Sequence, residues 1–162
     1  MPWFRRGESP PVVAPLQEND PADRPEALQE AIADVVRLVN SSAGRLPRAA
    51  VVTARQITDV LAEVVATAEV RPLDIHAVLS VQAAATDYLP TTVRSYVAVD
   101  ESLVDAPRVS GRTPRQSLME QLDDLEGAAL AVLEASQQQD VDGLMTQGNF
   151  LRTKFSRSDL DI

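Results

Sequence analysis

The sequence contains no cysteine, which excludes disulfide bonds and thiolate chemistry and is typical of a reducing compartment. Its one histidine, His76, has no second imidazole or thiolate with which to share a zinc ion, and no Glu-x-x-His pair for a di-iron site is present. The chain has only six glycines and no glycine-rich phosphate loop. We therefore expect no metal and no cofactor, and interpret His76 as a surface or helix-start residue.

Lysine and aromatic residues are also scarce. Lys154 is the only lysine, the arginines are scattered, and the formal net charge is −9. A field of that sign repels a polyanion unless basic residues are clustered, so nucleic-acid binding is disfavoured. Aromatic residues make up 4% of the chain. The core must therefore be built from leucine, valine, isoleucine and alanine.

The chain has no long hydrophobic run. No stretch approaches the roughly 20 apolar residues that a membrane-spanning helix needs. Met1–Arg6 carries charge but is followed by Gly7–Pro11, not by the apolar segment of a secretory signal. We expect a cytoplasmic protein that can associate with a membrane surface.

Good helix formers are plentiful, and they predict an all-α protein. Apolar residues recur every three or four positions over about 25–42, 47–70, 74–99 and 113–155, although Asp140–Gly143 can interrupt the last segment. Such stripes favour an antiparallel four-helix bundle with a proline-kinked third helix. The predicted organisation is a disordered, proline-rich tail over 1–24, a bundle domain over 25–156 and a C-terminal tail over 157–162.

The third predicted helix contains a proline in its interior. Pro90 removes a backbone hydrogen bond and clashes with the preceding turn, at a cost of about 3 kcal/mol, so we expect a kink there. Tyr88 and Tyr96 lie on either side of it, and Leu89 precedes it. These four residues either fill the core around the bend or line a groove in which a partner or an apolar ligand binds.

Two further segments are candidates for binding a partner. Phe150, Leu151, Lys154 and Phe155 either close the last helix turn or present an apolar docking patch. The N-terminal run Trp3-Phe4-Arg5-Arg6 places two aromatic residues beside two cations. That combination can bind a membrane surface or the groove of a partner protein.

No arrangement of residues predicts catalysis. Nothing places His76 beside a particular serine, and the glycine pattern of a nucleophile elbow is absent. The acidic runs Asp123-Asp124 and Asp140-Val141-Asp142 are interpreted as solvated, because a calcium loop would need further oxygen ligands and a closing glutamate. We expect a protein that is not an enzyme and has no catalytic residues.

Three motifs, in this order, carry a resemblance to known proteins: Asp87-Tyr88-Leu89-Pro90 with Tyr96, Gly111-Arg112-Thr113-Pro114 with Gln121-Leu122, and Phe150-Leu151 with Lys154-Phe155. Over about residues 70–156 the chain resembles a group of uncharacterised actinobacterial helical proteins. More distantly it resembles the family named for 5-bromo-4-chloroindolyl phosphate hydrolysis, which is related to toxic-anion-resistance proteins. The resemblance implies a helical protein associated with the cell envelope or with stress. No set of phosphatase residues transfers from it.

Three functions therefore remain open. The first is a non-enzymatic helical interaction or scaffold protein that binds a protein partner and can be peripheral to a membrane through its N-terminal tail. The second is a phosphate-ester hydrolase, which is supported only by the name of the resembled family. The third is a binder of a small apolar ligand at the kink of the third helix, which predicts an enclosed cavity lined by Tyr88 and Tyr96.

Overall fold

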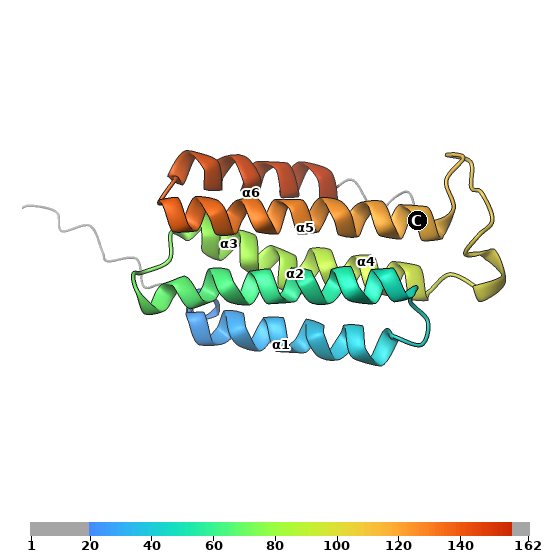
Figure 1. The fold of residues 1–162 in the computed structure, drawn as a ribbon, viewed down its shortest axis with the longest axis horizontal. Helices are drawn as coiled ribbons and strands as arrows, with labels where there is room; N and C mark the ends of the chain where they lie inside the picture. The colour runs from blue at the N-terminus through green and yellow to red at the C-terminus, as the bar shows by residue number, and fades with distance from the viewer. Residues whose placement is uncertain (1–19, 157–162) are drawn as a thin grey trace, which may run out of the picture.

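The computed structural model describes residues 20–156, and they are all-α with no strand. Figure 1 shows helices packed side by side and joined by short connections, with one longer loop between α4 and α5. The helices are α1 (Pro25–Ser42), α2 (Arg48–Ala66), α3 (Ile75–Ala83), α4 (Leu89–Val97), α5 (Pro114–Gln138) and α6 (Val141–Phe155), with a π-helical turn η3 (Ala84–Tyr88) between α3 and α4 and short 3-10 turns η1 (Pro21–Asp23), η2 (Thr67–Glu69) and η4 (Glu101–Leu103).

Helix starts follow local chemistry. Pro25 opens α1, and α1 has the bounds predicted from the sequence. The residue before it, Arg24, is the N-cap and makes no capping hydrogen bond with its side chain. Thr113 caps α5 through a capping box with Gln116, in which each side chain bonds the other's backbone N–H.

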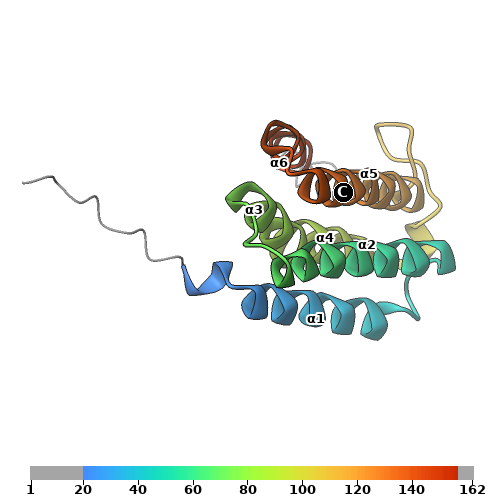
Figure 2. The ribbon, with the colours of Figure 1, turned by 60° about the vertical axis from the view of Figure 1, so that its left-hand side comes forward.

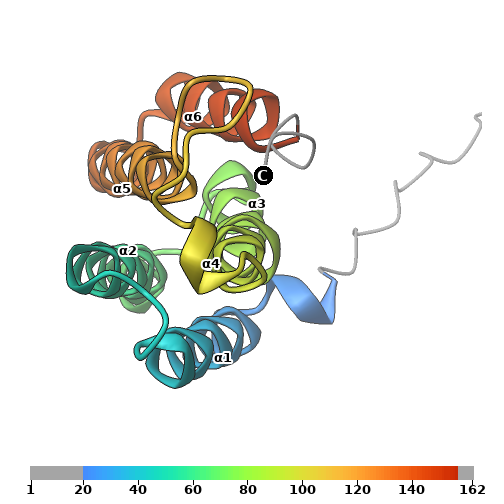
Figure 3. The ribbon, with the colours of Figure 1, turned by 90° about the vertical axis from the view of Figure 1, so that its right-hand side faces the viewer.

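Figures 2 and 3 show α1 at the bottom, α2 and the α3–η3–α4 rod side by side above it, and α5 and α6 at the top. The pairs α2–α5, α1–α2 and α5–α6 share the most extensive contacts. One continuous core fills the interior, and aliphatic side chains and alanine dominate it. Its largest fully buried side chains are Leu28, Ile57, Leu61, Leu89, Leu122, Leu125, Leu144, Val35, Val39, Val64, Val65 and Val81.

The predicted stripes supply this core, with exceptions at the helix ends. Ile75 lies in the first turn of α3 and is half exposed, and Phe150 is exposed on α6. Val52 on α2 is also exposed. Periodicity identifies which face is apolar but not where a neighbouring helix stops covering it.

The prediction of one helix over 113–155 is wrong, because the chain reverses after Gln138. Gln139 has φ +58° and ψ +33°, the left-handed conformation that often ends a helix. Asp140 then starts α6, and its carboxylate accepts a hydrogen bond from the Gly143 N–H at 2.9 Å. The interruption that the sequence permitted at Asp140–Gly143 is therefore a full reversal, and α6 folds back along α5 (Figure 1).

The third predicted helix is three consecutive segments. Ile75–Ala83 is α-helical, Ala84–Tyr88 widens to a π turn in which the Leu89 N–H bonds the Ala84 carbonyl, and the α-helix resumes at Leu89. Asp74 caps the start, where its carboxylate accepts from the His76 N–H at 2.8 Å. The irregularity thus lies in the turn immediately before Pro90.

Parts of the predicted tails can be compared with the structure. Residues 21–23 of the predicted N-terminal tail form the 3-10 turn η1, which contacts α1. Residues 1–19 of that tail and residues 157–162 lie outside the described residues. Within residues 20–156, none of the helices combines the length and hydropathy needed to cross a bilayer.

Candidate functional site

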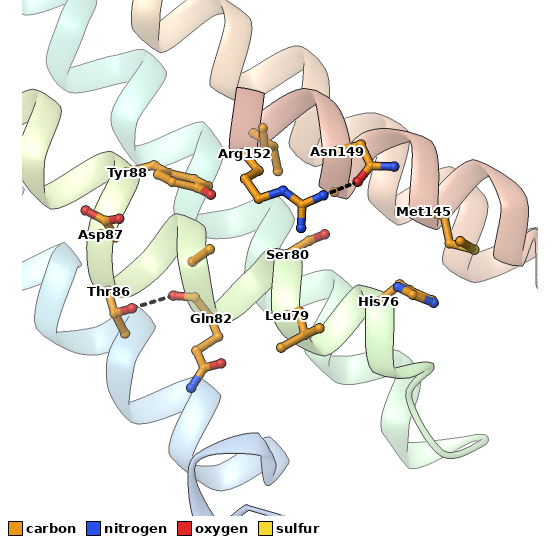
Figure 4. Close-up of a pocket in the computed structure, with 13 residues that line it drawn as sticks. His76, Leu79, Ser80, Gln82, Thr86, Asp87, Tyr88, Met145, Asn149 and Arg152 are labelled. Carbon is orange, nitrogen blue, oxygen red and sulfur yellow. Dashed lines mark hydrogen bonds between the residues drawn. The ribbon is translucent and has the colours of Figure 1, made fainter. Parts of the chain in front are cut away.

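A groove runs between α6 and the continuous segment formed by α3 and η3 (Figure 4). On α3 its wall is a stripe of residues three and four positions apart, His76, Leu79, Ser80 and Ala83. The π turn continues this wall with Thr86, Asp87 and Tyr88, and the opposite wall is Met145, Gly148, Asn149, Leu151 and Arg152 of α6. The hollow is open to solvent and has a volume of about 550 Å³, within the range of ligand pockets.

The two walls run in the same chain direction. Ser80 faces Gly148, and further along the pair the Tyr88 ring stacks on Phe155 with centroids 5.1 Å apart. Contacts that advance together on both helices require parallel axes. The groove therefore follows α3 and η3 from His76 to Tyr88, about 18 Å at the helical rise.

Small side chains make the hollow. Ala83, Ser80 and Gly148 meet where larger residues would close the space between the helices. A Cβ at position 148 would lie 3.5 Å from the Ser80 hydroxyl, so the α6 backbone passes close above this serine. Ser80 is buried, and its Oγ has no hydrogen-bond partner among the described residues.

Polar groups gather at the Tyr88 end of the groove. Figure 4 shows the Arg152 guanidinium reaching from α6 over the groove, where it donates to the Asn149 side-chain oxygen. Burial raises the pKa of Tyr88 above its usual 10.0, the Asp87 carboxylate raises it further, and the Arg152 charge opposes both. The Tyr88 hydroxyl is therefore a neutral hydrogen-bonding group at ordinary pH.

The rims of the groove are apolar and exposed. Leu79 on α3 is 49% exposed and Met145 on α6 is 44% exposed, although both are large hydrophobic side chains. Methionine adapts its shape to different partners and is common on protein-binding surfaces. Together with buried Leu151 the two rims supply most of the apolar surface of the groove, and polar side chains, among them His76 and Gln82, line the rest.

The structure separates the residues that were predicted to bind a partner. Tyr88 and Leu151 line the groove, so one candidate from each of two distant segments meets there. Phe155 joins the same segments through its stack on Tyr88. The four N-terminal candidates, Trp3, Phe4, Arg5 and Arg6, lie outside the described residues.

The other candidates lie elsewhere. Leu89 and Tyr96 are buried in the core, where the core-filling interpretation placed them, and a partner cannot reach them in this conformation. Pro90 is buried and borders a smaller hollow between α1 and the π turn. Phe150 is exposed under Lys154, whose ammonium lies 5.9 Å from the ring centroid and pairs with Asp124 at 2.6 Å.

Sequence reasoning missed most of the groove. His76 is a helix-start residue as predicted, but it also forms one end of the groove. Leu79, Met145 and Arg152 lie outside the predicted stripes, and no sequence signal marked Leu79 or Met145. Among residues 20–156 no cluster of three or more histidine, aspartate or glutamate side chains could hold a metal ion.

No protein-family model, curated protein or solved structure matches this chain. The resemblance stated above therefore remains a prediction.

Proposed function

We propose that this protein is a helical interaction protein that binds an amphipathic α-helix of a partner protein in the groove between α3 and α6. The observation that carries the proposal is the pair of exposed hydrophobic rims, Leu79 and Met145, on either side of a hollow whose lining is mostly apolar by area. A helix laid in a groove buries apolar residues of each of its turns against such rims. A length of about 18 Å accommodates about three helical turns.

Charge defines the orientation of the partner. The groove ends at Arg152 and Tyr88 on one side and at His76 on the other. A partner helix with a carboxylate at its Arg152 end would form a charge-assisted hydrogen bond there, which is stronger than a neutral one. The proposed partner therefore has an apolar face and an acidic side chain near one end.

Reversing the character of one rim tests this function. Leu79→Glu or Met145→Glu is expected to abolish capture of the partner from cells that express the protein, because the rim then carries a charge that binding must desolvate. Leu130→Glu is the matched control, since Leu130 on α5 is also 49% exposed and does not line the groove. Partner capture that survives the groove variants, or is lost equally with the control, would contradict the proposal.

The groove also bears on the small-ligand function. An apolar ligand at the kink was expected between Tyr88 and Tyr96, but the groove includes only the first of these. The open rims favour a long occupant over an enclosed small molecule. The hydrolase function has no arrangement of described residues in its favour.

We further propose that α1, α2, the α3–α4 rod and α5 act as an antiparallel four-helix scaffold and that Pro90 bends the third rod. The π turn immediately before Pro90 supports this, because a proline clashes with the carbonyl of the preceding turn and a wider turn relieves the clash. A crystal structure of Pro90→Ala should have regular α-helical bonds over Ala84–Tyr88. A π turn that persists would show that Pro90 does not cause it.

A further inference from the structure

The reversal between α5 and α6 is short and has no glycine at its left-handed position. Two residues, Gln139 and Asp140, connect the helices, and Gln139 adopts the conformation with positive φ that glycine favours. The preceding residues are glutamines, which are good helix formers. The same sequence therefore supports a straight continuation of α5 into α6, as its apolar periodicity predicts.

One side-chain interaction supports the turn, beside the backbone hydrogen bonds that the Asp140 N–H donates to the Ala135 carbonyl at 2.8 Å and the Gln139 N–H donates to the Ser136 carbonyl at 3.4 Å. The Asp140 carboxylate caps α6 by accepting from the Gly143 N–H, and a Cβ at 143 would lie 2.5 Å from the other carboxylate oxygen. The reversed form keeps the cap and strains Gln139, whereas the straight form loses the cap and relaxes Gln139. Opposing local preferences of similar size leave the two forms close in free energy.

If the chain straightens, α6 leaves its packing site between α3 and α5 unoccupied. Only three α6 side chains are buried, Leu144, Leu151 and Phe155, and a second copy of α6 restores every one of these contacts. In that site α6 runs antiparallel to α5. A two-fold axis through the straightened hinge therefore places the α6 of each chain against the α5 of the other. Exchange of an identical element is a known route from monomers to dimers.

We propose that this chain forms an exchanged dimer in which α5 and α6 become one helix and each α6 packs between α3 and α5 of the second copy. All contacts outside the hinge are conserved in such a dimer, so residues 139 and 140 set the equilibrium. Each groove then takes one wall from each chain. The exchanged dimer is independent of the proposed partner, because both forms retain the groove.

Hinge variants change the equilibrium in opposite directions. Gln139→Gly relaxes the left-handed residue and disfavours the straight helix, so it is expected to lower the dimerisation constant at least about tenfold over two hinges. Asp140→Ala removes the cap and favours the straight helix, so it is expected to raise the constant by about tenfold. Light scattering on size-fractionated protein measures both.

A disulfide test identifies the exchange itself, because the native chain has no cysteine to interfere. A chain carrying Asp140→Ala and Ser80→Cys is refolded with a chain carrying Asp140→Ala and Gly148→Cys. The exchanged dimer brings these two positions of different chains together, so oxidation should link the chains. A single chain carrying all three substitutions gives the reference yield of the bond.

Two results would overturn the proposal. One is an Asp140→Ala protein that stays monomeric at every concentration. The other is a dimer whose two chains do not form the disulfide, since that dimer leaves each α6 on its own chain.

Discussion

The Ser80 hydroxyl lies under Gly148 where α3 and α6 meet, and it has no hydrogen-bond partner among the described residues. A buried hydroxyl without a partner costs free energy, because it has lost water and gained nothing. A Cβ at position 148 would lie 3.5 Å from this hydroxyl, in ordinary van der Waals contact with it. This contact sets the depth of the groove that we assign to partner binding.

Removal of that hydroxyl should stabilise the protein. Ser80→Ala is expected to raise the free energy of unfolding by about 1 kcal/mol, since the desolvation cost disappears with the oxygen. Urea unfolding measures the change. Ser117→Ala is the control, because Ser117 is only half buried on α5 and should change stability by less than about 0.5 kcal/mol. A destabilised Ser80→Ala protein would mean that the hydroxyl has a partner.

The start of α6 depends on a glycine. Gly143→Ala places a Cβ 2.5 Å from the Asp140 carboxylate, so the cap must move and the protein should lose about 1 kcal/mol of stability. Gly127→Ala on α5 has nothing within 4 Å of its Cβ and should instead stabilise by about 0.5–1 kcal/mol. Thermal unfolding of both variants gives the comparison. Equal shifts in the same direction would contradict the capping geometry.

Tyr88 makes the stability of the protein vary with pH in the alkaline range. Its folded pKa lies above the unfolded value near 10.0, so the folded protein holds this proton more tightly. The resulting stability is fully present below pH 10 and is lost as the pH rises through the folded pKa. Tyr88→Phe removes this dependence, and the difference in unfolding free energy between the two proteins should change above about pH 10. A difference in unfolding free energy that stays constant with pH would show that burial does not raise the pKa of Tyr88.

The sequence predicted the helices better than their arrangement. Pro25 and Ser42 bound α1 as expected, because a proline start and a polar stop are local signals. Gln139 carries no such signal, because its left-handed conformation depends on the packing of α6 against α5 and α3. The apolar periodicity of the sequence also continues across Gln139 without a break. The reversal therefore could not be located by pattern alone.

The groove was predictable only in part. Tyr88 and Leu151 were candidates because an aromatic residue next to a helix-interior proline, or an apolar residue at a helix end, can indicate a binding surface. Leu79 and Met145 were not, because they lie outside the stripes that identify a core. Their proximity depends on α6 returning parallel to α3, which is a property of the tertiary structure.

The N-terminal candidates give a separate prediction. Trp3→Ala combined with Phe4→Ala is expected to reduce co-sedimentation with anionic lipid vesicles, because the variant loses the aromatic rings that insert at the interface and keeps only the attraction of the two arginines, about 1 kcal/mol each. Phe150→Ala is the control, since it removes an exposed aromatic residue of α6. Unchanged sedimentation of the double variant would exclude a membrane role for this segment.

Site-specific photo-crosslinking tests the binding groove most directly. A photoreactive residue is placed at position 79, 145 or 130, the protein is illuminated in its native cells, and the linked peptides are sequenced. We predict that positions 79 and 145 crosslink to the same helical segment of one partner and that position 130 does not. Equal yields from all three positions, or unrelated peptides from 79 and 145, would contradict the assignment of the groove.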